Sequence, residues 1–225
     1  MSTYIILSEK SWNSKLVENL SSQTEDNWTL VSTREEFNYE NLKKINPAKI
    51  FIPHWSYIIP ATIFNSFECI VFHMTDLPYG RGGSPLQNLI LRGHEKTKIS
   101  ALQVEEGIDT GDVYLKKELL LSGTAQEIYE RANKVIFEMI VEIVNENPKP
   151  IKQKGEPTLF KRRKPAMSNM SEVKSLDEVY DFIRMLDADG YPHAFLETEN
   201  CRSEFRKVAK QNDETLEAYV RIIKK

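Results

Sequence analysis

The sequence has 225 residues, of which 40% are hydrophobic and 28% are charged, and its formal net charge is −3. These values describe an ordinary soluble globular chain with one large hydrophobic core, and they exclude fibrous and disordered classes. A slightly acidic chain can hold a long polyanion only through a local basic patch, so we expect no nucleic-acid partner. No stretch approaches a membrane span and the N-terminus lacks signal-peptide features, so we expect a cytoplasmic protein with no membrane partner.

Cysteine usage limits the chemistry further. Cys69 and Cys201 are the only two cysteines in the sequence, and they lie far apart without a partner cluster of His and Cys residues. This spacing predicts neither a disulfide framework nor a zinc site. We therefore expect no metal.

Short apolar runs alternate with amphipathic stretches along the first part of the chain, a pattern typical of βα units on a mostly parallel sheet. The predicted strands cover residues 3–7, 29–32, 49–53, 69–73, 98–104 and 113–118. The predicted helices cover residues 11–20, 34–44 and 84–92.

A long amphipathic helix is predicted over residues 124–147. Its apolar residues recur at i, i+3 and i+4, which places them on one face of a helix. Thr124 and Glu127 have the spacing of a capping box, and Pro148 forbids continuation of the helix.

The remainder of the chain predicts a small second domain. Residues 149–165 are basic and proline-punctuated, which is typical of a linker. Ser175 can cap a following helix. The elements expected here are a short strand at 158–161, a helix at 176–186, and a strand pair at 194–198 and 203–208. The predicted organisation is a Rossmann-like α/β catalytic domain at residues 1–150, followed by a linker and a small α+β C-terminal domain at residues 151–225.

Two loops carry residues suited to a site. Ligands of parallel sheets bind beyond the carboxyl ends of strands. His73 closes the predicted strand 69–73, and the loop after it contains Arg81 and glycines whose backbone N–H groups can face an anion. Asp109 lies in another loop, beyond the strand 98–104, within reach of His73 if the two strands are neighbours.

These two loops resemble the signature blocks of the folate-dependent formyltransferases. The family pattern Asn-x-His-Pro-Ser-Leu-Leu-Pro-x-x-Arg-Gly is similar to VFHMTDLPYGRG at residues 71–82, and Gly-x-Asp-Thr-Gly-Asp is similar to GIDTGD at residues 107–112. FKRR at residues 160–163, and the segment from FIR at 182–184 to GYP at 190–192, resemble the C-terminal part of nucleotide-sugar N-formyltransferases. The resemblance covers most of the chain.

The resemblance implies transfer of the formyl group of 10-formyltetrahydrofolate to a primary amine. His73 would remove a proton from the amine, because an imidazole ionises near pH ~6.5. Asp109 would orient His73 and stabilise its protonated form. The family asparagine that helps to hold the formyl oxygen is replaced by Val71, and loss of one such donor costs about 10²–10³ in rate. The candidates for a replacement are His73 with a backbone group or water, Thr75 and His54.

The resemblance also implies ligand contacts and partners. The residues expected to bind the folate are His54, Trp55, Tyr57, Ile108 and Asp109. The residues expected to bind the acceptor are Thr75, Tyr79, Arg81, Gly82 and Gly83. The expected acceptor is a nucleotide-linked amino sugar, specifically a UDP-4-amino-4,6-dideoxy sugar of a pseudaminic-type pathway. Tyr79 or Tyr57 would stack on the base or sugar, and Arg81 or Lys161 would meet the diphosphate. The expected assembly is a homodimer, with the C-terminal tail as its interface.

Other interpretations stay open. A formyltetrahydrofolate hydrolase shares the expected fold and uses water as the acceptor, and a non-catalytic folate- or nucleotide-binding module gains weight from Val71. A nicotinamide-dependent enzyme is disfavoured because no GxGxxG follows the first strand. Asp109 can serve only to organise a turn, the loop around Arg81 can serve only to reverse the chain, and His54 can belong to a packed loop.

Overall fold

The computed structural model describes residues 1–10 and 13–225. Two compact units are present, and each is assembled from three segments of chain. The first unit consists of Met1–Arg81, Lys98–Leu119 and Ala132–Leu159, and the second of Gly82–Thr97, Leu120–Arg131 and Phe160–Lys225. The predicted division into residues 1–150 and 151–225 assumes contiguous domains, and it stays a prediction.

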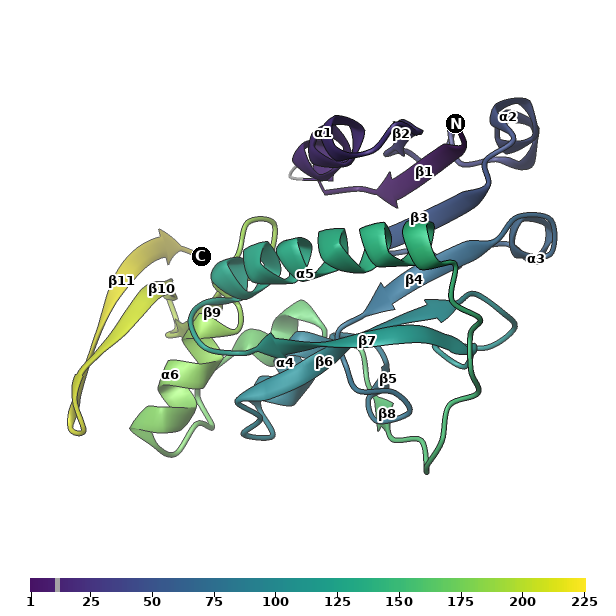
Figure 1. Ribbon diagram of the computed structural model, residues 1–225. Helices are drawn as coiled ribbons and strands as arrows, with labels where there is room; N and C mark the ends of the chain where they lie inside the picture. The colour runs from purple at the N-terminus through teal and green to yellow at the C-terminus, as the bar shows by residue number, and fades with distance from the viewer. Residues whose placement is uncertain (11–12) are drawn as a thin grey trace. The chain divides into compact units, whose positions relative to one another are not determined.

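A six-stranded sheet runs through the first unit in the order β2-β1-β3-β4-β6-β7 (Figure 1). Its strands are β1 (Thr3–Ser8), β2 (Asn27–Val31), β3 (Lys49–His54), β4 (Cys69–His73), β6 (Lys96–Gln103) and β7 (Val113–Leu120). The four strands from β2 to β4 pair in parallel, whereas β6 is antiparallel to β4. The predicted mostly parallel Rossmann-like sheet is therefore confirmed.

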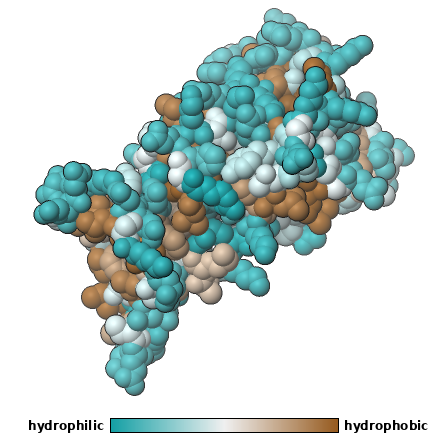
Figure 2. Space-filling model, turned by 90° about the horizontal axis from the view of Figure 1, so that it is seen from below, coloured by the Kyte–Doolittle hydropathy of each residue, from teal (hydrophilic) through white to brown (hydrophobic). Residues whose placement is uncertain are grey.

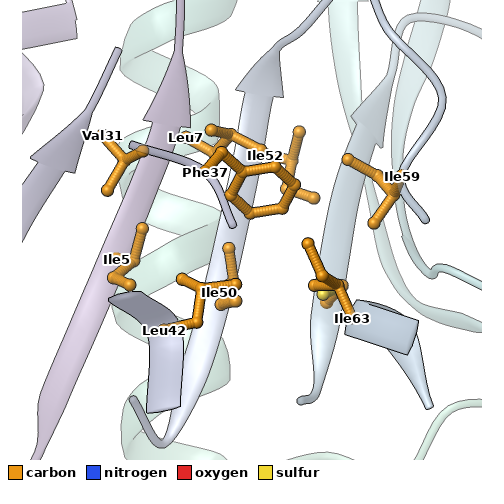
Figure 3. Packing of buried hydrophobic residues seen from close by; sticks show 10 residues of the cluster. Ile5, Leu7, Val31, Phe37, Leu42, Ile50, Ile52, Ile59 and Ile63 are labelled. Carbon is orange, nitrogen blue, oxygen red and sulfur yellow. The ribbon is translucent and has the colours of Figure 1, made fainter. Parts of the chain in front are cut away.

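The central strands owe their position to apolar residues on both faces. Strands covered on both faces read as near-continuous apolar runs, and β1 and β3 are buried at almost every position. On one face, Ile5 and Leu7 of β1 and Ile50 and Ile52 of β3 meet Leu42 in a cluster seen in Figure 3. Each such side chain contributes about 1.5–3 kcal/mol when it is fully buried.

The helices beside the early strands are α1 (Asn13–Gln23), α2 (Tyr39–Ile45) and α3 (Ala61–Phe64). The first two residues of the predicted helix 11–20 lie outside the described residues. Helix α2 begins later than the predicted residue 34, because Asn38 is its N-cap and accepts a hydrogen bond from the backbone nitrogen of Asn41 at 3.0 Å. Helix α3 was not predicted, since four residues give no detectable periodicity.

The long helix α5 (Ala125–Glu146) confirms the prediction for residues 124–147. The capping box is present: the backbone nitrogen of Thr124 donates to Glu127 Oε2 at 2.7 Å, and that of Glu127 donates to the Thr124 hydroxyl at 3.3 Å. Most of its apolar stripe is buried, and Ile136 and Ile143 are fully buried.

The second unit contains a three-stranded sheet in the order β11-β10-β9. Its strands are β9 (Ala194–Glu197), β10 (Cys201–Asn212) and β11 (Thr215–Lys224), and its helices are α4 (Pro85–Ile90), the 3₁₀ helix η1 (Pro165–Ser168) and α6 (Leu176–Arg184). Ser175 caps α6, as predicted, by accepting from the backbone nitrogen of Glu178 at 3.2 Å. Strand β11 was missed because it is exposed along most of its length and has no buried face to mark it.

A short two-stranded sheet pairs β5 (Arg81–Gly82) with β8 (Leu159–Phe160). Strand β8 falls within the predicted strand 158–161. Strand β5 was not expected, since the glycine-rich stretch around Gly82 reads as a loop. This pairing places the chain after residue 150 beside one of the two predicted site loops.

Candidate active site

Three neighbouring parallel strands end in polar residues at one edge of the sheet. Strand β1 ends at Ser8, β3 at His54 and β4 at His73. Strand β6 runs the opposite way and sets Ser100 opposite His73. Because ligands of α/β sheets bind beyond the carboxyl ends of parallel strands, this edge is the candidate site.

His73 is buried at this edge between two polar groups. Its Nε2 lies 2.7 Å from the carbonyl oxygen of Gly80, and its Nδ1 lies 3.5 Å from Oδ2 of Asp109. A carbonyl oxygen only accepts hydrogen bonds, so Nε2 carries the hydrogen in this arrangement. The lone pair of the neutral ring is then on Nδ1, and a carboxylate beside it stabilises the imidazolium that forms when Nδ1 takes a proton. The fold thus brings the two predicted catalytic residues together.

The loop that carries Gly80 is fixed to β6 by buried hydrogen bonds. Thr75 is fully buried, and its hydroxyl donates to the carbonyl oxygen of Gly80 at 3.4 Å. The Ser100 hydroxyl donates to the carbonyl of Thr75 at 2.7 Å and accepts from the nitrogen of Leu77 at 3.3 Å. Thr75, which was expected to contact substrate, supports the loop instead and has no exposed surface.

Asp109 is held in a left-handed backbone conformation with φ of 54°. Such a conformation is uncommon for a residue other than glycine, although aspartate adopts it more readily than most. A Cβ atom on Gly111 would lie 1.8 Å from the carbonyl oxygen of Gln103, so only glycine allows the loop to lie this close to β6. The Asp109 side chain is 14% exposed.

Gln153 joins the two loops, and sequence reasoning missed it. Its Oε1 accepts from Nε and Nη2 of Arg81 at 3.1 and 2.8 Å. Its Nε2 donates to the carbonyl oxygens of Asp109 and Gly111 at 2.9 and 2.8 Å. Gln153 lies in the basic segment that the sequence marked as a linker, where no motif distinguishes it.

The two glycines that were expected to bind the acceptor have a packing requirement. A Cβ on Gly82 would lie 2.4 Å from the carbonyl oxygen of Phe160, and one on Gly83 would lie 2.5 Å from Cβ of Arg162. The absence of a side chain at both glycines therefore allows β8 and the residues after it to pack closely against this loop. Tyr79, in the same loop, is partly buried.

Aromatic residues follow β3 at the same edge. Trp55 packs against Phe37 and Tyr57, with ring centroids 5.8 and 5.4 Å apart. Tyr57 is 44% exposed under the guanidinium of Arg34, and Ile108 in the second loop is 65% exposed. Tyr57 and Ile108 therefore present apolar surface at this edge of the sheet.

His54 belongs to a partly buried polar cluster. Burial, and then the positive charge of Lys10, lower the pKa of His54 to about 4. Its Nδ1 lies 3.4 Å from Nδ2 of Asn13, which also donates to the Ser8 hydroxyl at 2.6 Å. His54 is therefore neutral near pH 7, which argues against it as a cationic replacement for the missing asparagine.

Val71 occupies the position of that asparagine on β4. Alternate residues of a strand share a face, so Val71 lies on the same face as His73. Its side chain packs against Leu77, Leu102 and Val113. It stabilises the core here and offers no hydrogen bond to a ligand.

Asp76 adds a charged cluster to the first loop. Its carboxylate oxygens lie 2.6 Å from Lys116 Nζ and 3.0 Å from Lys98 Nζ. Burial acts to raise the pKa of Asp76, but hydrogen bonds from Lys116 and Lys98 outweigh it and hold that pKa below its usual value. The carboxylate is thus charged at neutral pH and anchors the loop to β6 and β7.

Two features are absent from the described residues, 1–10 and 13–225. No helix there is long and apolar enough to cross a membrane. Nor do three or more His, Cys, Asp or Glu side chains gather in a way that would hold a metal ion.

A Rossmann-like sheet with a His–Asp pair beyond its strand ends is typical of an α/β enzyme with its site at that edge. Two family profiles match the chain: "Formyl transferase" over residues 8–144, and "Methionyl-tRNA formyltransferase, C-terminal domain" over residues 165–223. The first match spans more than half of the sequence. The chain belongs to the formyltransferase family, which confirms the predicted class of enzyme.

Individual proteins support this membership. The methionyl-tRNA formyltransferase of Coxiella burnetii is 28% identical over 155 residues, which are 67% of this chain and 48% of that protein. The chain thus spans about half the length of the curated relatives it matches. A solved structure named methionyl-tRNA formyltransferase from Clostridium thermocellum is 49% identical, with a TM-score of 0.97 and 100% of both chains covered. A 4-N formyltransferase from Francisella tularensis shares the fold, with a TM-score of 0.68, 16% identity, and 88% and 93% of the two chains covered.

These comparisons support the formyltransferase family and not the narrower expectations drawn from the sequence. The relatives of higher identity are named for methionyl-tRNA, which is linked to a nucleic acid, and not for a nucleotide sugar. The expectation of no nucleic-acid partner conflicts with those names. That expectation relied on a net charge of −3, which averages over local basic runs such as residues 161–164.

Proposed function

We propose that the protein transfers the formyl group of 10-formyltetrahydrofolate to a primary amine. The observation that carries this proposal is the pairing of His73 and Asp109 at 3.5 Å, in the two loops that resemble the family signature. Family membership over residues 8–144 supports the same reaction class.

His73 acts as the base in this reaction. The attacking amine needs a free lone pair, so Nδ1 of His73 removes its extra proton. Asp109 stabilises the imidazolium, while the Gly80 carbonyl keeps the ring from rotating. The amine nitrogen bonds to the formyl carbon and, now positively charged, releases a second proton to water. The bond from the formyl carbon to N10 of the folate breaks, and His73 delivers the first proton to N10.

Negative charge develops on the formyl oxygen during the transfer and needs a donor in place of Val71. We assign the donor's role to a backbone N–H of the loop after β4, with the positive charge of protonated His73 beside it. The Thr75 hydroxyl already donates to Gly80, and His54 is neutral, so neither replaces the asparagine as well. The folate lies against Trp55 and Tyr57 after β3 and against Ile108 and Asp109 in the second loop.

For the acceptor we propose the α-amine of methionyl-tRNA. The support is the 49% identity over both full chains to the structure of that name, and the C-terminal profile over residues 165–223. Phosphates of a tRNA also suit the basic run along residues 149–164, because Lys and Arg side chains supply most nucleic-acid affinity. The basic residues in this run are Lys149, Lys152, Lys154, Lys161, Arg162, Arg163 and Lys164.

A nucleotide-linked amino sugar is the second candidate acceptor. Its support is the tail at residues 160–163 and 182–192, which resembles that of sugar formyltransferases. The same basic run can meet a diphosphate through charge-assisted hydrogen bonds. The two candidates differ in size, so one assay separates them.

The deciding experiment offers both acceptors to the protein with 10-formyltetrahydrofolate and measures formylated product by mass spectrometry. Methionyl-tRNA is one arm, and UDP- and dTDP-linked 3-amino and 4-amino sugars are the other. We expect formyl-methionyl-tRNA from the wild type and product reduced at least about 10²-fold in His73→Ala and Asp109→Asn. Asp213→Asn, the same change at an exposed aspartate in the turn between β10 and β11, is the matched control and keeps activity.

Other results of this assay assign other functions. Formylated sugar without formylated tRNA establishes the sugar acceptor. Formate released from the folate without an acceptor identifies a hydrolase. Folate binding without either product, and without any effect of His73→Ala, identifies a binding module.

We also propose a homodimer formed through β11. This strand is the edge of its sheet, and its Tyr219, Val220 and Ile222 are 57%, 41% and 69% exposed. Figure 2 shows apolar patches among the hydrophilic residues of the visible surface. Antiparallel pairing of two β11 strands about Tyr219 would place Glu217 of each copy opposite Arg221 of the other, a self-complementary arrangement.

The dimer is tested by analytical ultracentrifugation of two charge variants. Glu217→Arg alone would set four arginines against one another and yield a monomer. Adding Arg221→Glu to the same chain restores the opposite charges and the dimer. A monomeric wild type, or a Glu217→Arg protein that stays dimeric, would refute this interface.

A further inference from the structure

We infer that Gln153 is a positioning residue that sets the catalytic geometry of Asp109 by clamping its loop to the loop of Arg81. This inference rests on the proposed function, because it concerns the same reaction. Gln153 lies outside both signature blocks, about forty residues beyond Asp109 along the chain, and its role becomes visible only in the fold.

The amide of Gln153 is fully used. It has two N–H donors and two lone pairs on oxygen. The donors meet the carbonyl oxygens of Asp109 and Gly111 at 2.9 and 2.8 Å, and the lone pairs accept from Nε and Nη2 of Arg81 at 3.1 and 2.8 Å. All four hydrogen bonds are of ordinary length. The two carbonyl oxygens that accept from Gln153 are backbone atoms of the same loop. Among the natural side chains, asparagine has the same donors and acceptor but lacks the reach.

The clamp acts where the Asp109 loop needs support. Asp109 has a left-handed backbone, which is uncommon for a residue other than glycine. The two carbonyl groups that Gln153 holds flank Thr110, so the amide fixes the peptide units on both sides of the turn. The carboxylate of Asp109 is thereby kept 3.5 Å from Nδ1 of His73.

Arg81 gains a second role from the same contacts. Its guanidinium donates to a neutral amide and not to a carboxylate, so its positive charge is not neutralised by this partner. The clamp therefore holds Arg81 in a fixed orientation while leaving its charge available to an anionic acceptor. A glutamate at residue 153 would neutralise that charge and would place an oxygen against the carbonyls of Asp109 and Gly111.

Gln153→Glu is the decisive variant, because it changes the donors and keeps the shape. We expect kcat to fall about 10–100-fold, since displacing a catalytic group by about 1 Å costs this much, whereas KM for the folate changes less than about threefold. The matched control is Gln23→Glu, which makes the same change at an exposed glutamine at the end of α1 and leaves kcat unchanged.

A double-mutant cycle separates positioning from general stability. If Gln153 acts through Asp109, adding Gln153→Glu to Asp109→Asn lowers kcat no further than Asp109→Asn alone, within about twofold. If the two effects multiply, Gln153 supports the fold in some other way and the inference is wrong. An unchanged kcat in Gln153→Glu would also overturn it.

A readout that needs no activity keeps this test apart from the proposed function. In the wild-type protein, NMR should show that the side-chain amide protons of Gln153 exchange with solvent more slowly than those of Gln23. Equal exchange rates would mean that the clamp does not exist. If exchange is slow but the protein formylates no acceptor, the proposed function is refuted. The contacts of Gln153 would then be structural only, and the inferred catalytic role of Gln153 would also be refuted.

Discussion

Replacing Gly111 with alanine should separate catalysis from folding. The added Cβ would lie 1.8 Å from the carbonyl oxygen of Gln103, and real Cβ atoms essentially never come closer than 3.0 Å, so the loop must move by about 1 Å. This loop carries Asp109. We expect kcat to fall about 10²-fold and the free energy of unfolding to fall by about 1–3 kcal/mol. For a chain of this size, each kcal/mol lowers Tm by roughly 2–4 °C.

The matched control for this prediction is Gly93→Ala. Gly93 has φ of 74°, and a Cβ there meets nothing within 4 Å, so alanine adds backbone strain of about 1–2 kcal/mol without a collision. Both variants should melt below the wild type in a thermal scan, but only Gly111→Ala should lose formyl transfer measured on the same samples. A folded Gly111→Ala protein within tenfold of the wild-type kcat would refute the reasoning.

Three further predictions concern other groups. Burial, and then the charge of Glu68, raise the pKa of Cys69 to about 12, so iodoacetamide at pH 8 should label Cys69 only after unfolding; labelling of the native protein, read by mass spectrometry, would contradict this. The lowered pKa of Asp76 means that its ion pairs stabilise the fold above pH ~4 and are lost as pH falls through the folded-state pKa. Asp76→Asn should therefore lower the free energy of unfolding by at most about 1 kcal/mol at pH 7, because the side chain is 44% exposed. It should have no measurable effect once the wild-type carboxyl is protonated. A difference in urea unfolding between the variant and the wild type that persists at low pH would count against the ion pairs. Val71→Asn should lower stability by about 1–3 kcal/mol without raising kcat, since it inserts an amide among apolar residues; a rise in kcat would show that no group has replaced the family donor.

Local patterns were sufficient for much of the fold. The helix α5 and its cap at Thr124 follow from spacing along the chain, because a capping box and an apolar stripe involve residues only three or four apart. The strands β1, β3 and β4 follow for a similar reason, since fully covered strands carry continuous apolar runs. Strand β11 had no such signal, because neither of its faces is buried in the chain.

The candidate site could likewise be predicted only in part from local patterns. His73 and Asp109 were predicted from strand ends and from two signature blocks, both of which can be read along the chain. The support beneath them could not be predicted, because Ser100 and Thr75 are ordinary polar residues whose hydrogen bonds join segments 25 residues apart. Thr75 was expected at the substrate because its loop resembles the first signature block, and the structure buries it.

The sequence by itself therefore determined the class of fold, the His–Asp pair and the family, because each depends on the order of residues within short segments. The tertiary structure alone decided which nitrogen of His73 faces Asp109, and which residue holds the two loops together. The orientation of the His73 ring and the contacts of Gln153 both depend on how distant segments meet in space. Gln153 and Arg81, for example, are 72 residues apart in the sequence. Such a contact leaves no trace in local spacing, since a glutamine in a basic, proline-punctuated segment looks the same whether it is solvated or makes four hydrogen bonds.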